Sequence, residues 1–287
     1  MTASIDPKSA IDTFCEAAEL NRDDPLRKGS QLVFGDYGQL VVTGDLHGNR
    51  YNFDKLVKYC GLASAPARHV ILQELIHQEI KTAEQQDLSH EILLEAARWK
   101  CEFPDQIFLL QSNHEVAQLT GRGLLKDGRG VLEDFVVGVD ATYGAEATPK
   151  VIEAIERFIE SFPLAARTAN RVFISHSLPS EREMPDFDPS VLDRPVTRED
   201  LDGGPASKFL WGRRHPRALL QRLAEILDAD LFIVGHQPQD MGFRQVDERL
   251  LILSSDHSHG VFLPIDLSKP ATMAGLVKKI RKFVSVG

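Results

Sequence analysis

The sequence has only three cysteines, Cys15, Cys60 and Cys101, spread over a chain of 287 residues. No two of them have the C-x-x-C spacing of a redox or zinc motif, and their odd number does not indicate a disulfide framework. We therefore predict unreactive thiols in a reducing compartment. A thiolate metal site is not expected.

Long apolar runs are also missing. No stretch reaches the roughly 20 apolar residues that span a bilayer, and residues 1–20 lack the basic start and continuous apolar core of a signal peptide. We expect a cytoplasmic protein with no membrane partner. Because 42 acidic residues outnumber 33 basic ones, the net charge of −9 also argues against nucleic acid as a partner. The oligomeric state does not follow from the sequence.

Two common catalytic signatures are absent. The chain has no G-x-S-x-G motif of a serine hydrolase and no G-x-G-x-x-G loop after a strand. Its 43% hydrophobic and 26% charged residues are ordinary for a globular protein. Since no linker divides the chain, we expect a single domain over residues 1–287.

Strand-like and helix-like segments alternate along the chain. Apolar spacing predicts an N-terminal helix at residues 7–20 and a C-terminal helix at residues 273–285. Residues 31–45 read as two short strands around a tight turn at Tyr37-Gly38. Further helices are expected near residues 52–60, 88–101, 149–162 and 216–228, and further strands at 69–75, 106–111, 171–175, 231–235 and 250–255. This alternation indicates an α/β architecture with ligands at the strand ends.

Two polar segments remain open to more than one interpretation. Residues 177–206 are rich in Pro, Asp and Gly, which predicts a long surface loop, either a lid or binding loop or a disordered excursion. Asp256, His257 and His259 follow the last of these strands. They either line the rim of a site or form an exposed turn.

Four apolar runs each end in residues that can bind a metal ion: LVVTGDLHG, IFLLQSNHE, VFISH and LFIVGH. Because strands present their last residues at a sheet edge, these side chains can converge from distant parts of the sequence. Oxygen and imidazole ligands without thiolate suit Mn, Fe, Zn or similar ions. Each piece alone has a plainer reading, such as a structural histidine or an N-cap at Asn113. The candidates are Asp45, His47, Asn113, His114, His176 and His236.

Gly44-Asp45-Leu46-His47-Gly48 and Ser112-Asn113-His114-Glu115, followed by two strand-end histidines, resemble the motifs of the calcineurin-like metallophosphoesterase superfamily. The nearest branch is the phosphoprotein phosphatase branch, whose Leu-Trp segment is similar to Phe209-Leu210-Trp211. The resemblance covers about residues 31–266, the motif-bearing core. It implies a four-layer αββα sandwich, with two mixed β-sheets flanked by helices.

The resemblance also implies two metal ions, divalent or trivalent, of Mn, Fe or Zn. Asp45 and His47 would bind the first ion, and Asn113, His176 and His236 the second. Together the ions would activate a water that attacks phosphorus.

Two further roles follow from the same resemblance. His114 would act as the general acid that protonates the leaving group. Arg213 and Arg214 lie where the family supplies a phosphate-contacting arginine, and one of them is the candidate for that contact. The alternative is a solvated basic turn.

The second motif departs from the family pattern Gly-Asp-x-x-Asp-Arg-Gly. Glu74 stands where the family has its metal-bridging Asp, His77 where a second Asp orients the general acid, and Gln78 where an Arg binds phosphate. Glutamate keeps the carboxylate and can still bridge two ions, whereas glutamine loses the charged fork. The role of His77 stays open.

The expected function is therefore hydrolysis of a phosphate ester by a serine/threonine phosphatase-like enzyme. Its substrate would be a phosphorylated protein or a small phosphorylated metabolite. One alternative is a dinucleotide polyphosphate hydrolase. Another is a catalytically impaired pseudophosphatase that binds metal or phosphate, because the second motif is altered.

Overall fold

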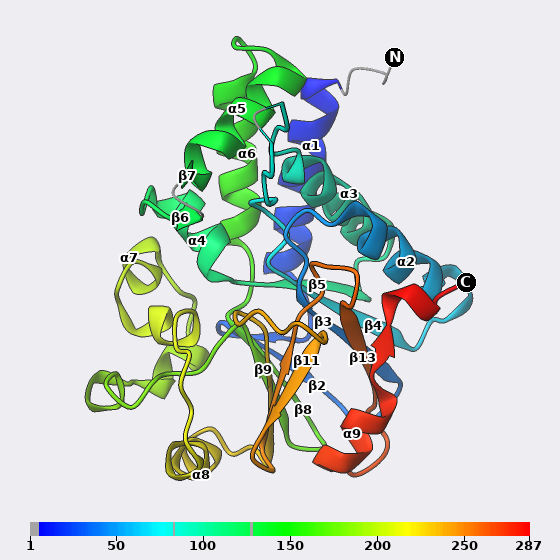
Figure 1. Ribbon diagram of the computed structural model, residues 1–287, viewed down its shortest axis with the longest axis vertical. Helices are drawn as coiled ribbons and strands as arrows, with labels where there is room; N and C mark the ends of the chain where they lie inside the picture. Colours follow the sequence, from blue (N-terminus) through cyan, green and yellow to red (C-terminus); the bar gives the residue numbers. More distant parts are fainter. Residues whose placement is uncertain (1–5, 83, 127–128) are drawn as a thin grey trace.

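The computed structural model describes residues 6–82, 84–126 and 129–287. Two mixed β-sheets occupy the centre, and helices lie outside them (Figure 1). This confirms the predicted α/β fold of two sheets flanked by helices.

The larger sheet has seven strands in the order β1-β2-β8-β9-β10-β12-β11. Strands β9, β10 and β12 are parallel, so their carboxyl ends share one edge. Strands β8 and β11 run antiparallel to β9 and β12. The bounds are β1 (Arg27–Lys28), β2 (Gln31–Phe34), β8 (Ala165–Thr168), β9 (Val172–Ser175), β10 (Leu231–Val234), β11 (Phe243–Val246) and β12 (Leu250–Leu253).

The second sheet has five strands in the order β14-β13-β3-β4-β5. Strands β3, β4 and β5 are parallel, and β13 runs antiparallel to β3. The bounds are β3 (Gln39–Asp45), β4 (Arg68–Gln73), β5 (Ile107–Leu110), β13 (Val261–Asp266) and β14 (Arg281–Lys282). Strands β6 (Leu125–Lys126) and β7 (Arg129–Gly130) form a separate two-stranded ribbon.

Alternating side chains divide the core between the layers. In β3, Leu40 and Val42 belong to the cluster that fills the space between the two sheets, whereas Val41 belongs to the cluster under the helices. The aromatic rings of Phe34 and Phe108 meet between the sheets at a centroid distance of 5.2 Å. Successive side chains of a strand point to opposite faces of the sheet. Because each face packs against one of the two core clusters, both faces of these strands are apolar.

Helices cover the outer faces of the sheets. Helix α1 begins at its N-cap Asp6, whose carboxylate accepts backbone N–H groups of the first turn, and packs against α3 and α6. Helix α8 places Leu219, Leu220 and Leu223 in the outer core cluster. The helices are α1 (Pro7–Arg22), α2 (Arg50–Cys60), α3 (Ser89–Glu102), α4 (Asn113–Thr120), α5 (Val131–Tyr143), α6 (Thr148–Glu160), α7 (Arg198–Leu201), α8 (Arg217–Ile226) and α9 (Met273–Lys279), with the short 3₁₀ helices η1 (Leu62–Ser64), η2 (Met184–Asp186), η3 (Pro189–Asp193), η4 (Pro205–Phe209) and η5 (Phe283–Ser285).

The C-terminal helix predicted at residues 273–285 is wrong in its second half. Helix α9 ends at Lys279, and Ile280 takes an extended conformation. The next two residues pair with β13 as the edge strand β14, which brings the ring of Phe283 to 5.0 Å from that of Phe262. Edge pairing and burial of Phe283 therefore override the helical spacing.

Residues 177–206, predicted as a long surface loop, contain short helices and buried side chains. Short helices η2, η3 and α7 and the start of η4 lie within this segment. Val191 and Leu201 are buried in the core, and the Arg194 guanidinium binds both carboxylate oxygens of Asp200 at 2.6 and 2.7 Å. Local packing thus orders a segment whose composition is typical of loops.

Strands β2 and β3 form as predicted on either side of Tyr37-Gly38, but they do not pair with each other. Strand β2 pairs with β8 in the larger sheet, and β3 pairs with β4 and β13 in the other. Within the described ranges, no helix combines the length and apolar character needed to cross a membrane.

Candidate metal centre

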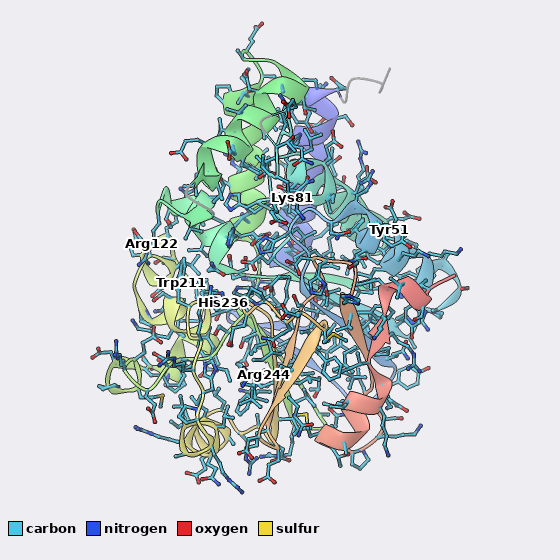
Figure 2. All side chains as sticks on the ribbon, viewed as in Figure 1. Tyr51, Lys81, Arg122, Trp211, His236 and Arg244 are labelled. Carbon is cyan, nitrogen blue, oxygen red and sulfur yellow. The ribbon has the colours of Figure 1, made fainter. Side chains whose placement is uncertain are left out.

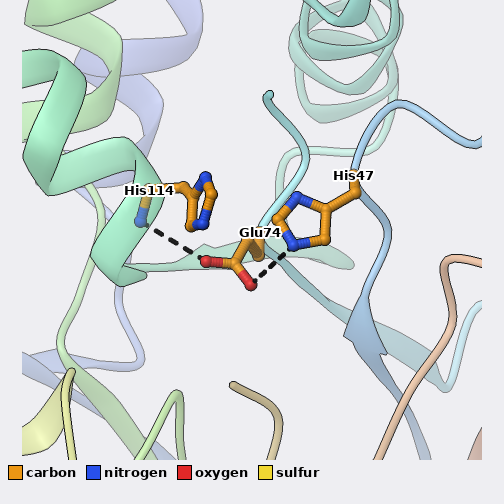
Figure 3. A group of neighbouring side chains, drawn as sticks. All are labelled: His47, Glu74 and His114. Carbon is orange, nitrogen blue, oxygen red and sulfur yellow. Dashed lines mark hydrogen bonds and ion pairs between the residues drawn. The ribbon is translucent and has the colours of Figure 1, made fainter. Parts of the chain in front are cut away.

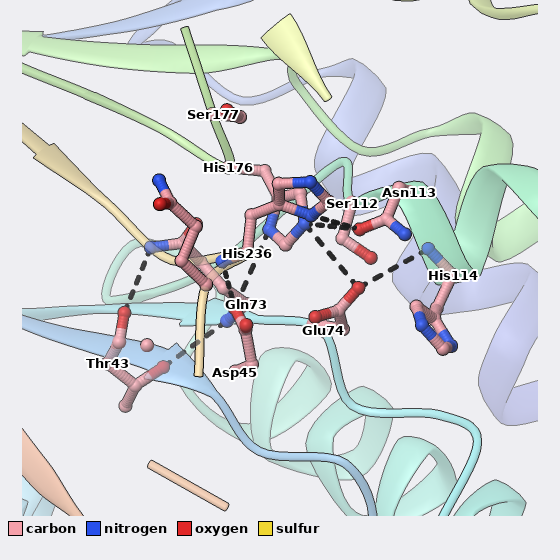
Figure 4. A network of polar contacts seen from close by, with 12 residues as sticks. Thr43, Asp45, Gln73, Glu74, Ser112, Asn113, His114, His176, Ser177 and His236 are labelled. Atoms are coloured by element: carbon pink, nitrogen blue, oxygen red, sulfur yellow. Dashed lines mark hydrogen bonds and ion pairs between the residues drawn. The ribbon is translucent and has the colours of Figure 1, made fainter. Parts of the chain in front are cut away.

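The predicted ligands meet where strands from both sheets end. Strand β3 ends at Asp45, and Glu74 directly follows β4. Asn113 begins α4 shortly after β5, while His176 and His236 follow β9 and β10. Figure 4 shows these side chains grouped around one point at the facing edges of the sheets. The two parallel sets of strands therefore bring together residues that are far apart in the sequence.

Asp45 and His236 link the two sheets directly. The Asp45 Oδ1 atom accepts the backbone N–H of His236 at 2.9 Å. A Cβ at Gly235 would lie 2.1 Å from that same oxygen, so only glycine permits this approach. Gly235 and His236, which follow β10, therefore fix the position of the Asp45 carboxylate at the end of β3.

Asn113, His176 and His236 converge through their side-chain ligand atoms. The Asn113 Oδ1 atom lies 2.6 Å from Nε2 of His176 and 2.8 Å from Nδ1 of His236 (Figure 4). All three residues are buried. One oxygen and two imidazole nitrogens within such distances are a donor set that suits a transition-metal ion.

Glu74 lies between two groups of potential ligands. Its Oε2 atom is 3.3 Å from Nε2 of His47, and its Oε1 atom is 3.4 Å from Nε2 of His176. One group of mutually close ligand atoms comprises His47, Glu74 and His114, shown in Figure 3, and the other comprises Asp45, Glu74 and His176. The position predicted for a bridging carboxylate is therefore shared by both groups.

The backbone at the site adopts a conformation that side chains disfavour. His47, Glu74, His77 and His236 all have positive φ angles, of 42°, 45°, 62° and 66°. Such left-handed residues are uncommon outside glycine and cost energy that the surrounding structure must supply. Four of the seven non-glycine residues with positive φ in the described structure therefore lie at this site.

The electrostatics fit bound cations. Burial raises the pKa of the Asp45 carboxyl well above its usual range, and the negative charge of Glu74 raises it further. Burial lowers the pKa of His176 well below its usual range and that of His236 to about 3. Neutral imidazoles are the form that binds a metal ion, and the raised pKa of Asp45 means that its ionised form is costly to bury unless a cation compensates it. The residues present therefore fit the two ions that the sequence predicts.

His114 is held by the second-motif residue whose role the sequence left open. The Nδ1 atoms of His77 and His114 are 2.9 Å apart, and Nε2 of His77 is 3.0 Å from the Gln118 carbonyl oxygen. Because that oxygen accepts, His77 donates from Nε2 and its Nδ1 accepts from His114. With Nδ1 donating to His77, His114 has a proton on Nε2 to give when its ring is the doubly protonated imidazolium.

Glu115 connects two turns of the site through buried hydrogen bonds. Its Oε1 atom accepts the backbone N–H of Leu75 at 2.7 Å, and its other oxygen accepts from the Ser112 hydroxyl. Buried in this way, it ties the turn before α4 to the turn after β4. These contacts hold Glu74 and Asn113 in register.

A cavity of about 340 Å³ opens over these ligands. Arg213 lines it, whereas Arg214 does not. The charge of Arg213 also lowers the pKa of both His176 and His236, second to burial for His236. Gln78 faces a neighbouring cavity of about 450 Å³ instead.

The cavity also has walls beyond the predicted metal ligands. Glu79, Leu124 and Trp211 line it, and so does Asp256 from the polar turn after β12. His257 and His259 from that turn do not line it. Trp211 belongs to the Leu-Trp segment and Asp256 follows a strand, whereas Glu79 and Leu124 had no local signal.

Comparison with known proteins agrees with this geometry. The sequence profile of the calcineurin-like phosphoesterases matches residues 38–240, well over half of the chain. The chain belongs to the calcineurin-like phosphoesterase family. Human, rat and mouse serine/threonine-protein phosphatase 5 are each 24% identical to this phosphoesterase over 180 residues. That alignment covers 62% of this chain but only 32% of those phosphatases, so the match spans about a third of their length.

Solved structures show the same fold. A protein serine/threonine phosphatase from Saccharomyces cerevisiae, described as similar to human phosphatase PP5, superposes with a TM-score of 0.69 at 16% identity, covering 91% of this phosphoesterase and 83% of that chain. The cold-active protein-tyrosine phosphatase of a Shewanella species superposes with a TM-score of 0.58 at 13% identity, covering 92% and 84%. At sequence identities this low, the similarity shows that the fold is shared.

Proposed function

We propose that this phosphoesterase hydrolyses phosphate monoesters with two metal ions, in the manner of a serine/threonine phosphatase. The observation that carries the proposal is the position of Glu74, which belongs to both groups of ligand atoms. A carboxylate shared in this way suits a two-metal centre and would be costly to bury without cations.

The chain's own residues divide the work between binding and proton transfer. Asp45 and His47 would hold one ion, and Asn113, His176 and His236 the other, with Glu74 between them. Bound ions would supply the Lewis acidity that activates water and neutralises phosphoryl oxygens.

His114 would give a proton from Nε2 to the leaving oxygen, with its ring oriented by His77. Arg213 would bind the phosphoryl group, because it lines the cavity and carries the charge that Gln78 lacks. Since the ligands come from both sheets, we also propose that the chain works as one domain, with a motif-bearing core at about residues 31–266.

The names of the relatives support a phosphorylated protein or metabolite as the substrate. Serine/threonine-protein phosphatase 5 and the tyrosine phosphatase are named for action on phosphorylated proteins, which favours a phosphoprotein or a smaller phosphate ester here. A metal-binding pseudophosphatase is the second candidate, because neither Gln78 nor His77 reproduces the charge of the family motif.

One experiment separates these candidates. We would measure metal content of the purified protein and hydrolysis of hexyl phosphate, an alkyl ester with a poor leaving group, with added Mn²⁺, in the native protein and in His114→Ala. Two ions and turnover that falls in the variant are expected. Two ions without turnover in the native protein would identify the pseudophosphatase instead, and absence of metal would overturn both readings.

A further inference from the structure

A second cavity continues from the proposed metal centre. It has a volume of about 630 Å³ and is lined by residues 180–183 and 211–214. Trp211 and Arg213 line both this cavity and the one over the metal ligands. A third cavity of about 380 Å³ also contains Arg213 and Arg214 and adds Arg244. We call the second and third cavities together the arginine groove.

Four arginines line this groove, and their charges are not compensated by ion pairs. Among the described residues, no carboxylate forms an ion pair with Arg182, Arg213, Arg214 or Arg244, and all four side chains are exposed. Several surface arginines elsewhere are paired with carboxylates, among them Arg171, Arg194, Arg198 and Arg217, whereas others, such as exposed Arg222 and Arg281, form no ion pair with a described residue. The groove therefore concentrates free positive charge.

The acidic residues of the groove do not cancel this charge. Only Glu181 and Glu183 line it, against four arginines. The Glu183 Oε2 atom already accepts from the backbone N–H and the hydroxyl of Ser180, at 2.8 and 2.6 Å. In a protein with a net charge of −9, a basic groove beside the centre is a local exception.

Two buried donors of residues that line the groove also lack partners. The buried indole Nε1 of Trp211 and amide Nε2 of Gln237 have no hydrogen-bond partner within the part of the chain that the structure describes. Trp211 further links the groove to its surroundings, since the Arg122 guanidinium lies 5.1 Å from its ring and the His236 ring lies 6.2 Å away (Figure 2). Donor-rich, cationic walls suit a ligand that offers only acceptors.

The segment that carries Arg213 and Arg214 is firmly anchored. The Ser177 hydroxyl donates to the Gly212 carbonyl, and Nε2 of buried His215 donates to the Leu178 carbonyl at 2.9 Å. A Cβ at Gly212 would lie 1.9 Å from that carbonyl oxygen. Two consecutive arginines are thereby held at the junction, with only Arg213 reaching the metal cavity.

We infer that the arginine groove is a subsite for a second anionic group of the substrate, a phosphate or a carboxylate, beyond the phosphate that is hydrolysed. The inference rests on the proposed function for the orientation of the substrate, with its scissile phosphate at Arg213. It predicts that this phosphoesterase prefers esters that carry additional negative charge.

The catalytic test compares substrates that differ in this second charge. Hexane-1,6-diol bisphosphate is set against hexyl phosphate, and a phosphoserine peptide with flanking glutamates against its glutamine counterpart. We expect kcat/KM to be about tenfold higher for the member of each pair that carries the additional negative charge, which is the value of one charge-assisted contact. This preference should become smaller at high salt. If only the bisphosphate is preferred over its partner, the second anionic group is a phosphate. If only the glutamate peptide is preferred over its partner, the group is a carboxylate.

The variant Arg214→Gln/Arg244→Gln should remove the preference and leave hydrolysis of the singly charged substrates unchanged. Neither residue lines the metal cavity. The matched control is Arg217→Gln, an exposed arginine outside the groove that is already paired. Thermal melting of each variant checks the fold.

Binding of hexane-1,6-bisphosphonate and hexylphosphonate, measured by calorimetry on the metal-loaded protein, tests the groove without turnover. Tighter binding of the bisphosphonate by about tenfold, lost in the double variant and kept in the control, supports the subsite. Equal binding together with equal kcat/KM would overturn it, even if all esters are hydrolysed. Absence of turnover with the binding difference intact would instead contradict the proposed function alone.

Discussion

The carboxylate of Asp45 accepts the backbone N–H of His236 at 2.9 Å, across 191 residues of sequence. One residue ends a strand of the five-stranded sheet, and the other follows a strand of the larger sheet. This contact closes the two sheets on each other at the candidate centre. It depends on the absence of a side chain at Gly235.

Gly235→Ala should therefore disrupt metal binding. The new Cβ would lie 2.1 Å from Oδ1 of Asp45, so the carboxylate must move out of position. We expect metal content by atomic emission to fall well below two ions per chain. Gly123→Ala is the control, since a Cβ there meets no atom within 4 Å. Full metal content in Gly235→Ala would show that the Asp45 contact is dispensable.

Glu74→Ala should empty both metal sites, because both groups of ligand atoms include Glu74. Asp45→Ala and His236→Ala should each reduce occupancy as well. Glu79→Ala provides the comparison, since it removes a carboxylate that lines the same cavity but belongs to neither group. Two retained ions in Glu74→Ala would exclude the bridging role.

His114→Asn should affect poor leaving groups most. An alkyl phosphate needs a proton on its departing oxygen, and loss of a general acid typically costs about 10²–10⁴ in rate. Nitrophenolate leaves without a proton, so p-nitrophenyl phosphate should lose much less. Kinetics on both esters give the ratio directly. An equal loss on both would mean that His114 serves binding or folding instead.

Protonation of buried His90 should make the fold less stable in mild acid. Burial lowers its pKa to about 4, while the unfolded value is about 6.5. The unfolded state therefore binds the proton first, and stability present above pH 6.5 is lost as pH falls toward 4. Between pH 7 and 5 this amounts to about 2 kcal/mol. Protonation of other buried histidines acts in the same direction.

The His90 contribution is isolated by His90→Gln, whose side chain stays neutral. Urea unfolding at pH 7 and pH 5 should show a smaller acid-induced loss in this variant than in the native protein. His259→Gln, at an exposed position, should behave like the native protein. The same acid-induced loss in His90→Gln would assign the effect to other groups.

Lys100 and Asp24 form a buried ion pair, and substitutions at the two positions should be strongly coupled in their effect on stability. The Nζ and Oδ2 atoms are 3.0 Å apart, and the side chains are 0% and 2% exposed. Lys100→Met leaves a buried carboxylate without its cation and should cost about 3–5 kcal/mol of unfolding free energy. In a double-mutant cycle, Lys100→Met/Asp24→Asn should cost less than the sum of the single changes. Additive costs would show that the pair is not coupled.

The sequence by itself determined the strands that lead to the candidate centre and the residues that end them, but not β8, β11 or β13. Apolar runs of strand length mark β4, β5, β9, β10 and β12, and the ligand candidates follow from their positions at strand ends. These features are local, because side-chain period and turn chemistry depend on neighbouring residues. The helix at α5 was not predicted, since its mixture of glycine and β-branched residues carries no strong helical signal.

Only the tertiary structure decided which of these segments share a sheet and which side chains meet. Strands β2 and β3 are neighbours in sequence but separate in space, and Phe283 leaves a helical pattern to reach Phe262. Likewise, contacts between distant elements place Arg213 rather than Arg214 over the ligands and give His114 a histidine partner. The physical reason is that burial and pairing across the fold outweigh local preferences, which differ by only about 1 kcal/mol.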